Sequence, residues 1–263
     1  MNTQMAAIIK KDMQSITSNK RMFATLLIVP IVLTIFLPSV FILTLYFVPE
    51  EGEELLQLLE TLPLPLQSGS SLQSMILLML NFILPGFFLM IPIMASSVMS
   101  AASFVGEKEK RTLETLLYCP LSLKQIFRSK VTASFLISMV VSGISFAAML
   151  VVVEALSYTI TGGFVLPDIK WIFILFLVAP AISLIAITLI VRMSAKAQSV
   201  EDAQQGAVFL LIPVLLLLIG QFTGILLISS WLLLSIGILC AFAAVILLNK
   251  SMSHFQYETL LKN

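Results

Sequence analysis

The sequence predicts an all-α integral membrane protein with six transmembrane helices, an N-terminal amphipathic interfacial helix and a short cytoplasmic coupling helix. Its 263 residues are 59% hydrophobic and only 11% charged, and the mean hydropathy is +1.07. Average soluble domains are about 25% charged, and a small soluble domain cannot bury so large an apolar fraction. The net charge is only +1, so no basic field favours nucleic acid. These values argue against a soluble enzyme, a nucleic-acid binder and a disordered chain.

Six apolar runs are long enough to cross a bilayer, which takes roughly 20 residues of helix. We expect the crossings at residues 22–48, 72–105, 131–153, 171–191, 204–222 and 231–249. Together they form a transmembrane domain over residues 22–249, preceded by an amphipathic segment, 1–21, and followed by a tail, 250–263. The first crossing has a charged start but no cleavage pattern after it, which indicates a retained signal anchor.

Three features of these runs predict departures from simple rods. The second crossing would measure about 50 Å as one helix, against a hydrocarbon core of about 30 Å. It therefore either projects into the cytoplasm or bends at Pro85 and Pro92. Trp171 stands at the start of the fourth crossing, where an interfacial aromatic anchor is expected. The fifth and sixth crossings share one charge-free run, so we expect a tight turn near residues 221–230.

The distribution of charge predicts the orientation. With six crossings, every lysine and arginine except Lys170 falls on the side that holds both termini. The positive-inside rule makes that side the cytoplasm. The Glu-rich loop, 49–71, is then external, and the chain is a multi-pass protein of the cell (plasma) membrane.

The N-terminal segment has the pattern of an amphipathic helix. Its apolar positions at helical spacing are Met5, Ile9, Met13 and Ile16, while Lys10, Lys11, Asp12 and Gln14 lie elsewhere. Such a helix lies on the inner membrane surface with its cations toward anionic headgroups. Anchoring the first crossing is the simpler interpretation, and contact with a partner protein is the alternative.

The loop after the second crossing, 106–120, is the most informative part of the sequence. It has an apolar ridge of Leu113, Leu116 and Leu117, and opposite-charge pairs Glu107–Arg111 and Lys110–Glu114 at i,i+4. Pro120 ends this short helix, and Ser122 with Gln125 fits a capping box that opens the next one. Two interpretations are open: a solvated loop with stop-transfer cations, or a docking helix on which a soluble motor pushes.

This loop resembles the coupling segment of prokaryotic ATP-binding-cassette (ABC) permeases of the type-2 exporter family. The residues that carry the resemblance, and that it would place against an ATPase, are Gly106, Glu107, Lys108, Glu109, Lys110, Arg111, Thr112, Leu113 and Glu114. A weaker match is Ala195–Gln205, which is similar to the family's fourth–fifth cytoplasmic loop. The six-crossing plan and the N-terminal helix agree with the family along the whole chain, although the external loops are modest.

The resemblance implies a permease subunit of an ATP-driven exporter that works by alternating access. Its implied partners are two cytosolic ABC ATPase subunits, a second permease copy in a homo- or heterodimer, and the lipid membrane. The sequence has no phosphate-binding loop of the form Gly-x-x-x-x-Gly-Lys-Ser/Thr. We therefore expect no enzyme activity and no cofactor on this chain, with ATP and Mg on the partner ATPase. The alternatives are a stand-alone channel or secondary carrier, or a non-transporting membrane docking subunit.

The crossings offer little chemistry of their own. No Asp, Glu, Lys or Arg falls in the middle of a crossing, where a charge is costly and usually marks an ion pathway. Glu154, at the outer end of the third crossing, is explained equally well as an interfacial residue. No metal-ligand or nucleophile motif is present. The absence of central charge favours an amphiphilic or apolar cargo.

Two stripes of hydroxyl side chains run along the second and third crossings. They consist of Ser96, Ser97, Ser100 and Ser103, and of Ser134, Ser138, Ser142 and Ser145. Close helix packing is the simpler interpretation, and lining of a substrate path is the alternative. We also expect Asn81 with Pro85 to open the second helix, because proline removes a backbone hydrogen bond. The substrate-path candidates are Asn81, Ser96, Ser100, Ser138 and Ser142.

Overall fold

The computed structural model describes residues 3–48, 71–109, 121–194, 197, 199–222 and 230–254. All of its regular elements are helices. Those before the coupling segment are α1 (Thr3–Ser18), α2 (Lys20–Ile31), η1 (Val32–Phe36), α3 (Leu37–Phe47), α5 (Ser71–Leu78), η2 (Met79–Ile83), α6 (Leu84–Phe88) and α7 (Met90–Glu109). Those after it are α9 (Leu123–Thr161), α10 (Lys170–Phe173), η3 (Ile174–Val178), α11 (Ala179–Ser194), α12 (Val200–Gln204), η4 (Gln205–Ala207), α13 (Val208–Phe222) and α14 (Ser230–His254).

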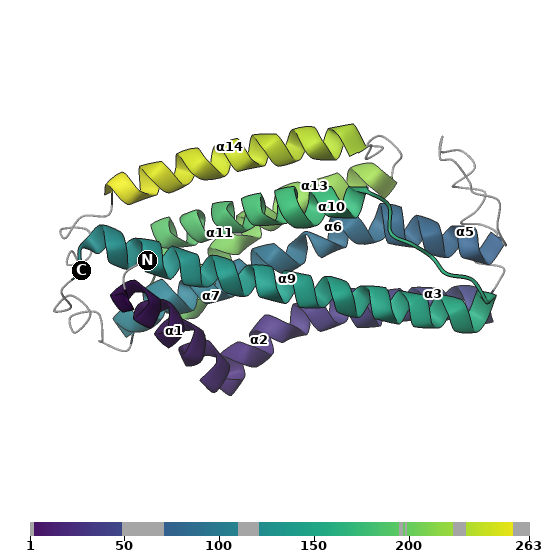
Figure 1. The fold of residues 1–263 in the computed structure, drawn as a ribbon, viewed down its shortest axis with the longest axis horizontal. Helices are drawn as coiled ribbons and strands as arrows, with labels where there is room; N and C mark the ends of the chain where they lie inside the picture. Colours follow the sequence, from purple (N-terminus) through teal and green to yellow (C-terminus); the bar gives the residue numbers. More distant parts are fainter. Residues whose placement is uncertain are drawn as a thin grey trace.

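Six helical runs within the described residues are long and apolar enough to cross a membrane. They are Leu26–Phe47, Leu72–Glu107, Leu123–Thr161, Lys170–Ser194, Val200–Gly220 and Trp231–Met252. Successive runs point in opposite directions along the bundle, so α1 and the C-terminal end of α14 lie at the same end (Figure 1). The predicted all-α membrane fold with six crossings is confirmed.

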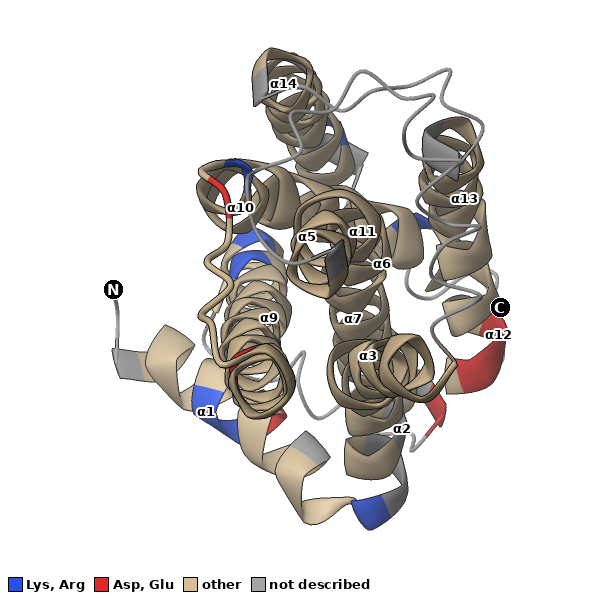
Figure 2. Ribbon diagram, turned by 90° about the vertical axis from the view of Figure 1, so that its right-hand side faces the viewer, with Lys and Arg blue, Asp and Glu red and all other residues tan. Residues whose placement is uncertain are grey.

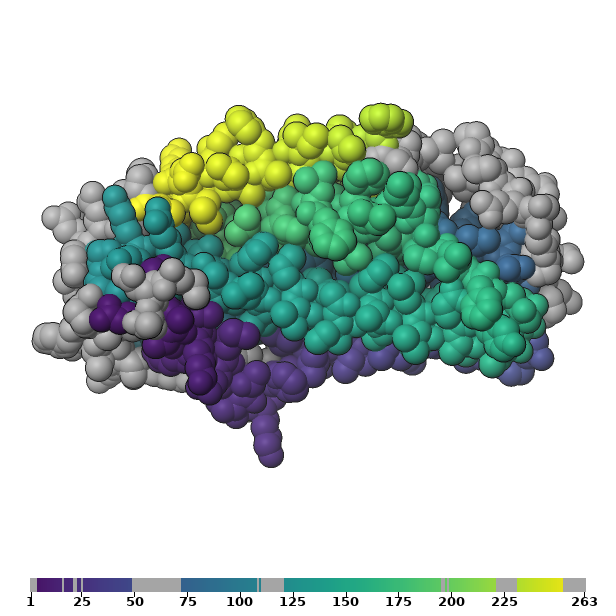
Figure 3. Space-filling model, viewed as in Figure 1, coloured from purple at the N-terminus to yellow at the C-terminus, as the bar shows by residue number. Residues whose placement is uncertain are grey.

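α7 is the most buried of these helices, and α14 is the most exposed. Viewed along the bundle, α7 is surrounded by other helices and packs most extensively against α9 and α11 (Figure 2). α9 is visible along the length of one face, with α1 against one of its ends (Figure 3). Outward side chains such as Phe176 and Trp231, which are 78% and 81% exposed, are apolar. Surfaces of this kind suit a lipid environment.

Three π-helical segments interrupt the spans, and each has a proline two residues beyond its end. Pro38 follows η1, Pro85 follows η2 and Pro180 follows η3. Proline has no N–H, and its ring clashes with the carbonyl four residues earlier. A wider i→i+5 turn relieves this clash. The predicted departure of the second crossing from one straight helix takes this form before Pro85, and a break at Leu89 precedes α7.

The beginning and end of α9 follow from local sequence. The predicted capping box is present: the Ser122 side chain accepts a bond from the Gln125 N–H, and the Gln125 side chain accepts one from the Ser122 N–H. Gly162, with φ 69°, ends the helix in the left-handed conformation that glycine adopts readily. α9 therefore extends beyond the expected crossing, 131–153, at both ends.

Two expectations about orientation need correction. Trp171, expected as an outward interfacial anchor, instead points into the bundle, where it is 2% exposed and its ring lies against those of Phe88 and Phe146. On α1, Asp12 was expected away from the apolar positions, but it is 5% exposed and lies on the buried face with Ile8 and Ile9. The expected turn near 221–230 falls largely outside the described residues.

Candidate functional site at the base of the coupling segment

Five side chains from three helices meet at the end of the bundle where α1 contacts α7 and α9 (Figure 1). We call them the charged cluster: Lys11 and Asp12 of α1, Ser103 and Glu107 of α7, and Lys130 of α9. The two residues on α7 are four positions apart and therefore share one face of that helix. All members except Lys11 are buried.

Lys130 is the centre of the charged cluster and is 2% exposed. Its Nζ lies 2.8 Å from Glu107 Oε2 and 3.9 Å from Asp12 Oδ2. It also donates to the backbone carbonyl of Ser103 and lies 5.5 Å from the centre of the Phe104 ring. An ammonium group has three donors and no acceptor, and these neighbours offer it oxygen acceptors and a π face.

The α1 residues complete the charged cluster. Lys11 Nζ lies 2.6 Å from Glu107 Oε1, so both carboxylate oxygens of Glu107 face an ammonium group. The Ser103 hydroxyl donates to Asp12 Oδ2 over 2.6 Å. Two cations and two anions thus face one another with no net formal charge. Only the Lys11 side chain, at 55% exposure, is largely in contact with solvent.

The main consequence of this arrangement is mechanical. A buried ion pair adds little net stability over apolar packing, but removing one partner leaves an uncompensated charge and costs about 3–5 kcal/mol. Moving α1, α7 and α9 apart at this point would leave charged side chains without their partners, which is costly. The end of α7, from which the predicted coupling segment begins, is held to two neighbouring helices.

The structure describes only the first residues of the predicted coupling segment. Gly106 and Glu107 are buried and Glu109 is exposed, all within α7. Glu107 forms tertiary ion pairs with Lys11 of α1 and Lys130 of α9, while its expected partner Arg111 lies outside the described residues. The remaining candidates that lie outside the described atoms are the Lys108 side chain and residues Lys110, Arg111, Thr112, Leu113 and Glu114.

The described parts of the two segments that resemble the permease family lie side by side. α12, within the weaker match Ala195–Gln205, packs against α7. A Cβ added at Gly106 would lie 3.8 Å from Val200 Cγ2. Both segments therefore belong to the same end of the bundle as the charged cluster.

Sequence reasoning missed the roles of Asp12, Ser103 and Lys130. Asp12 carried a usable signal, because it falls three and four residues after Ile9 and Ile8, on the buried face of α1. A carboxylate on such a face predicts a cationic partner. Lys130 carried no comparable signal, since a cation just before a crossing is also expected from topology alone.

The substrate-path candidates on α7 and α9 lie inside the bundle. Ser96 and Ser100 are buried and bond to carbonyls of their own helix. Ser138 bonds to the Pro92 carbonyl and lies 3.0 Å from the Ser183 hydroxyl, so it links α9 to α7 and α11. The Ser142 hydroxyl is buried and has no hydrogen-bond partner among the described residues.

Asn81, the remaining path candidate, lies in η2, away from the charged cluster. Its side-chain oxygen accepts the Asp168 N–H over 2.8 Å. Asn81 therefore fastens the chain before α10 to the second run. Within the described part of the chain, no group of three or more His, Cys, Asp or Glu side chains could hold a metal ion.

A known protein family matches this chain over nearly its whole length. Residues 3–234 match the model of the ABC-2 type transporter family, from α1 into α14, and every member of the charged cluster is included. Comparison with the curated proteins gives no match. The resemblance seen in the sequence is confirmed, and the chain belongs to the ABC-2 type transporter family.

Proposed function

We propose that this chain exports a substrate across the cell membrane by alternating access, driven by ATP hydrolysis in separate subunits. Family membership makes the chain a multi-pass permease subunit of an ABC transporter, associated with ABC ATPase subunits. The proposal adds the direction of transport, two ATPase subunits that hold ATP and Mg, and a second permease copy. We expect no catalysis by this chain itself.

The observation that carries the proposal is the charged cluster at the start of the predicted coupling segment. Glu107 is tied to α9 through Lys130 and to α1 through Lys11. A displacement applied to residues 106–120 would therefore move three helices together instead of bending α7 alone. Such a unit suits the transfer of force from a closing ATPase to the membrane part.

Burial of the serine stripes between α7, α9 and α11 supports a weaker part of the proposal. Hydroxyls on facing helices give a moderately polar seam without charge. If these helices shift during transport, the seam can open toward an amphiphilic or apolar molecule. We therefore retain Ser96, Ser100, Ser138 and Ser142 as the proposed path, together with Asn81.

Orientation is tested by chemical labelling of single cysteines. After replacement of Cys119 and Cys240, a cysteine is placed at Glu53 or at Arg111, and cells are treated with a membrane-impermeant maleimide. We expect labelling at residue 53 in intact cells and at residue 111 only after the membrane is opened. The reverse pattern would place the coupling segment outside and remove the basis of the proposal.

Coupling is tested with the chain and the ABC ATPase of the same genome in nanodiscs. Arg111→Glu should reduce ATPase capture by about tenfold, the loss of roughly 1.4 kcal/mol of binding, while insertion and thermal stability are kept. Lys170→Glu makes the same charge change at the opposite end of the bundle, where it breaks the pair with Asp168, and should leave ATPase capture unchanged. Equal capture by both variants would reject the docking role. Solute conductance without any ATPase would favour a channel or carrier instead.

A further inference from the structure

In the second run, one backbone carbonyl lacks the N–H donor that a regular π turn would supply from its own helix. In η2 the Leu84 N–H donates to the Met79 carbonyl, as expected for an i→i+5 turn. The next carbonyl, that of Leu80, would take its π-helical bond from residue 85. That residue is Pro85, which has no N–H.

A side chain from the fourth run bonds to this carbonyl. Trp171 Nε1 donates to the Leu80 carbonyl over 3.2 Å. The indole is 2% exposed, and its ring centre lies 5.3 Å from that of Phe88 and 5.0 Å from that of Phe146. Indole nitrogen is a donor only, so it matches a free acceptor in an apolar site.

A second bond lies beside the first. Asn81, the next residue of η2, accepts the Asp168 N–H, three residues before Trp171 along the chain. The equivalent carbonyls before Pro38 and Pro180 belong to Leu33 and Leu175, and within the described residues neither receives a side-chain donor. The π turn at η2 is thus hydrogen-bonded to the start of the fourth run and to the residue Asp168 just before it.

We propose that Trp171 is a positioning residue whose indole N–H replaces the hydrogen that Pro85 lacks, and that this bond holds the bend of the second run. The bond opens and re-forms as the helices shift between conformations, a part of the inference that rests on the proposed alternating-access function. A single hydrogen bond changes a two-state equilibrium by about tenfold. That bias is large enough to favour one conformation and small enough to be reversed in each cycle.

The bond itself is tested by a double-mutant cycle on the purified chain. Pro85→Ala restores an N–H at residue 85, so Trp171→Phe should cost clearly less in that background. We expect Trp171→Phe alone to lower the melting temperature by about 3 °C and by less than half of that when combined with Pro85→Ala. The smaller ring of phenylalanine affects both backgrounds alike, so its contribution cancels.

Pro180→Ala is the matched control for the cycle. It also restores an N–H after a π segment, but one without an indole donor, so its effect should add to that of Trp171→Phe. Additive effects for the Pro85 pair would overturn the assignment of the bond. This measurement needs no ATPase and remains readable if the proposed function fails.

Opening of the bond is tested with the native side chain in place. The sequence has 2 tryptophans, so Trp231→Phe leaves Trp171 as the single indole. In nanodiscs with the ATPase bound, Mg-ATP should shift or quench its emission as the bond opens. The Trp171→Phe variant reports Trp231, which is 81% exposed, as the control signal. Unchanged Trp171 emission in a complex that hydrolyses ATP would overturn the opening step while leaving the exporter proposal intact.

Discussion

The two ends of the bundle join helices by different chemistry. At one end, ammonium and carboxylate groups of the charged cluster hold α1, α7 and α9. At the other end, single hydrogen bonds to backbone N–H and carbonyl groups attach the segment 163–169, which we call the strap, to α5, η2 and α9. Buried ions must be completely paired to be tolerated, whereas single hydrogen bonds to the backbone can be broken one at a time at modest cost.

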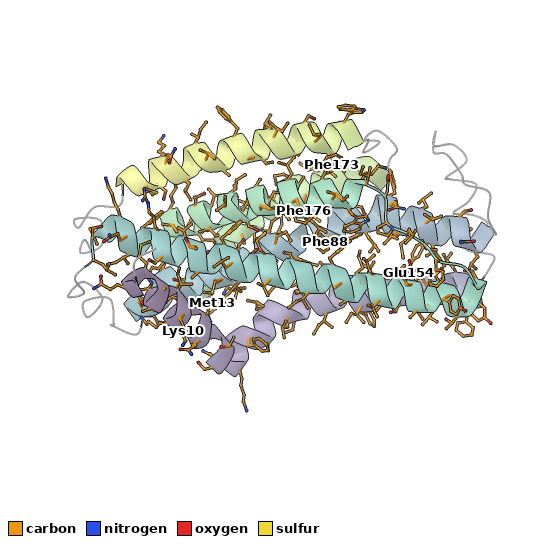
Figure 4. All side chains as sticks on the ribbon, viewed as in Figure 1. Lys10, Met13, Phe88, Glu154, Phe173 and Phe176 are labelled. Atoms are coloured by element: carbon orange, nitrogen blue, oxygen red, sulfur yellow. The ribbon has the colours of Figure 1, made fainter. Side chains whose placement is uncertain are left out.

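The strap is attached mainly through its backbone. Gln73 donates to the Phe164 carbonyl and Ser157 to the Gly163 carbonyl. The Val165 N–H reaches Glu154, which lies beside the strap (Figure 4). Beside these bonds, Lys170 Nζ lies 3.5 Å from Asp168 Oδ2 in a partly exposed ion pair. The comparison indicates a stiff junction at the charged cluster and an adjustable one at the far end.

The largest loss of stability is expected when Lys130, the centre of the charged cluster, is replaced. Lys130→Met leaves two buried carboxylates facing only Lys11, so we expect a loss of about 3–5 kcal/mol of stability, or about 10 °C in melting temperature. Lys124→Met removes an exposed cation from the same helix and should change little. Adding Glu107→Gln to Lys130→Met should recover part of the loss, because the remaining Lys11 and Asp12 charges balance. Equal melting of both single variants would show that the charged cluster does not hold the helices.

An intermediate effect is expected at the strap end. Asn81→Ala removes the acceptor of the Asp168 N–H and should cost about 1 kcal/mol. Hydrogen exchange of the peptide that contains Asp168 should become faster while the α1 peptide is unchanged. Ser39→Ala, which removes a hydroxyl bonded only within its own helix, is the control. If exchange accelerated equally at α1, the two ends would not be independent.

The smallest effect is expected at the exposed edge of the charged cluster. Lys11→Gln removes a half-exposed partner of Glu107 and should cost at most about 1 kcal/mol. Because salt screens exposed pairs, the difference from wild type should shrink between low and high ionic strength. Lys10→Gln, an exposed neighbour on α1 (Figure 4), serves as the comparison. A loss as large as that of Lys130→Met would mean that Lys11 is buried in the working state.

The sequence allowed the crossings to be predicted because apolar length and capping are local properties. Ser122 and Gln125 marked the start of α9 correctly, and Pro85 marked an irregular second run. The partners of these features could not be read in the same way. Glu107 finds Lys11, which is 96 positions away in the chain, and no spacing rule connects them. Trp171 was expected at the membrane interface because tryptophan is common there. Its hydrogen-bond acceptor, the Leu80 carbonyl, is 91 positions away in the chain and could be identified only from the structure.

The π turns before Pro38, Pro85 and Pro180 also shift the angular phase of every residue beyond them. One extra residue in a turn rotates the following helix by roughly 100° relative to a regular one. A helical wheel drawn straight through Pro85 therefore assigns wrong faces to the residues on one side of it. Deletion of a single residue from η2 would restore the regular helical phase. The side chains on one side of the deletion would then face different neighbours, so the number of residues at this point is as constrained as their type.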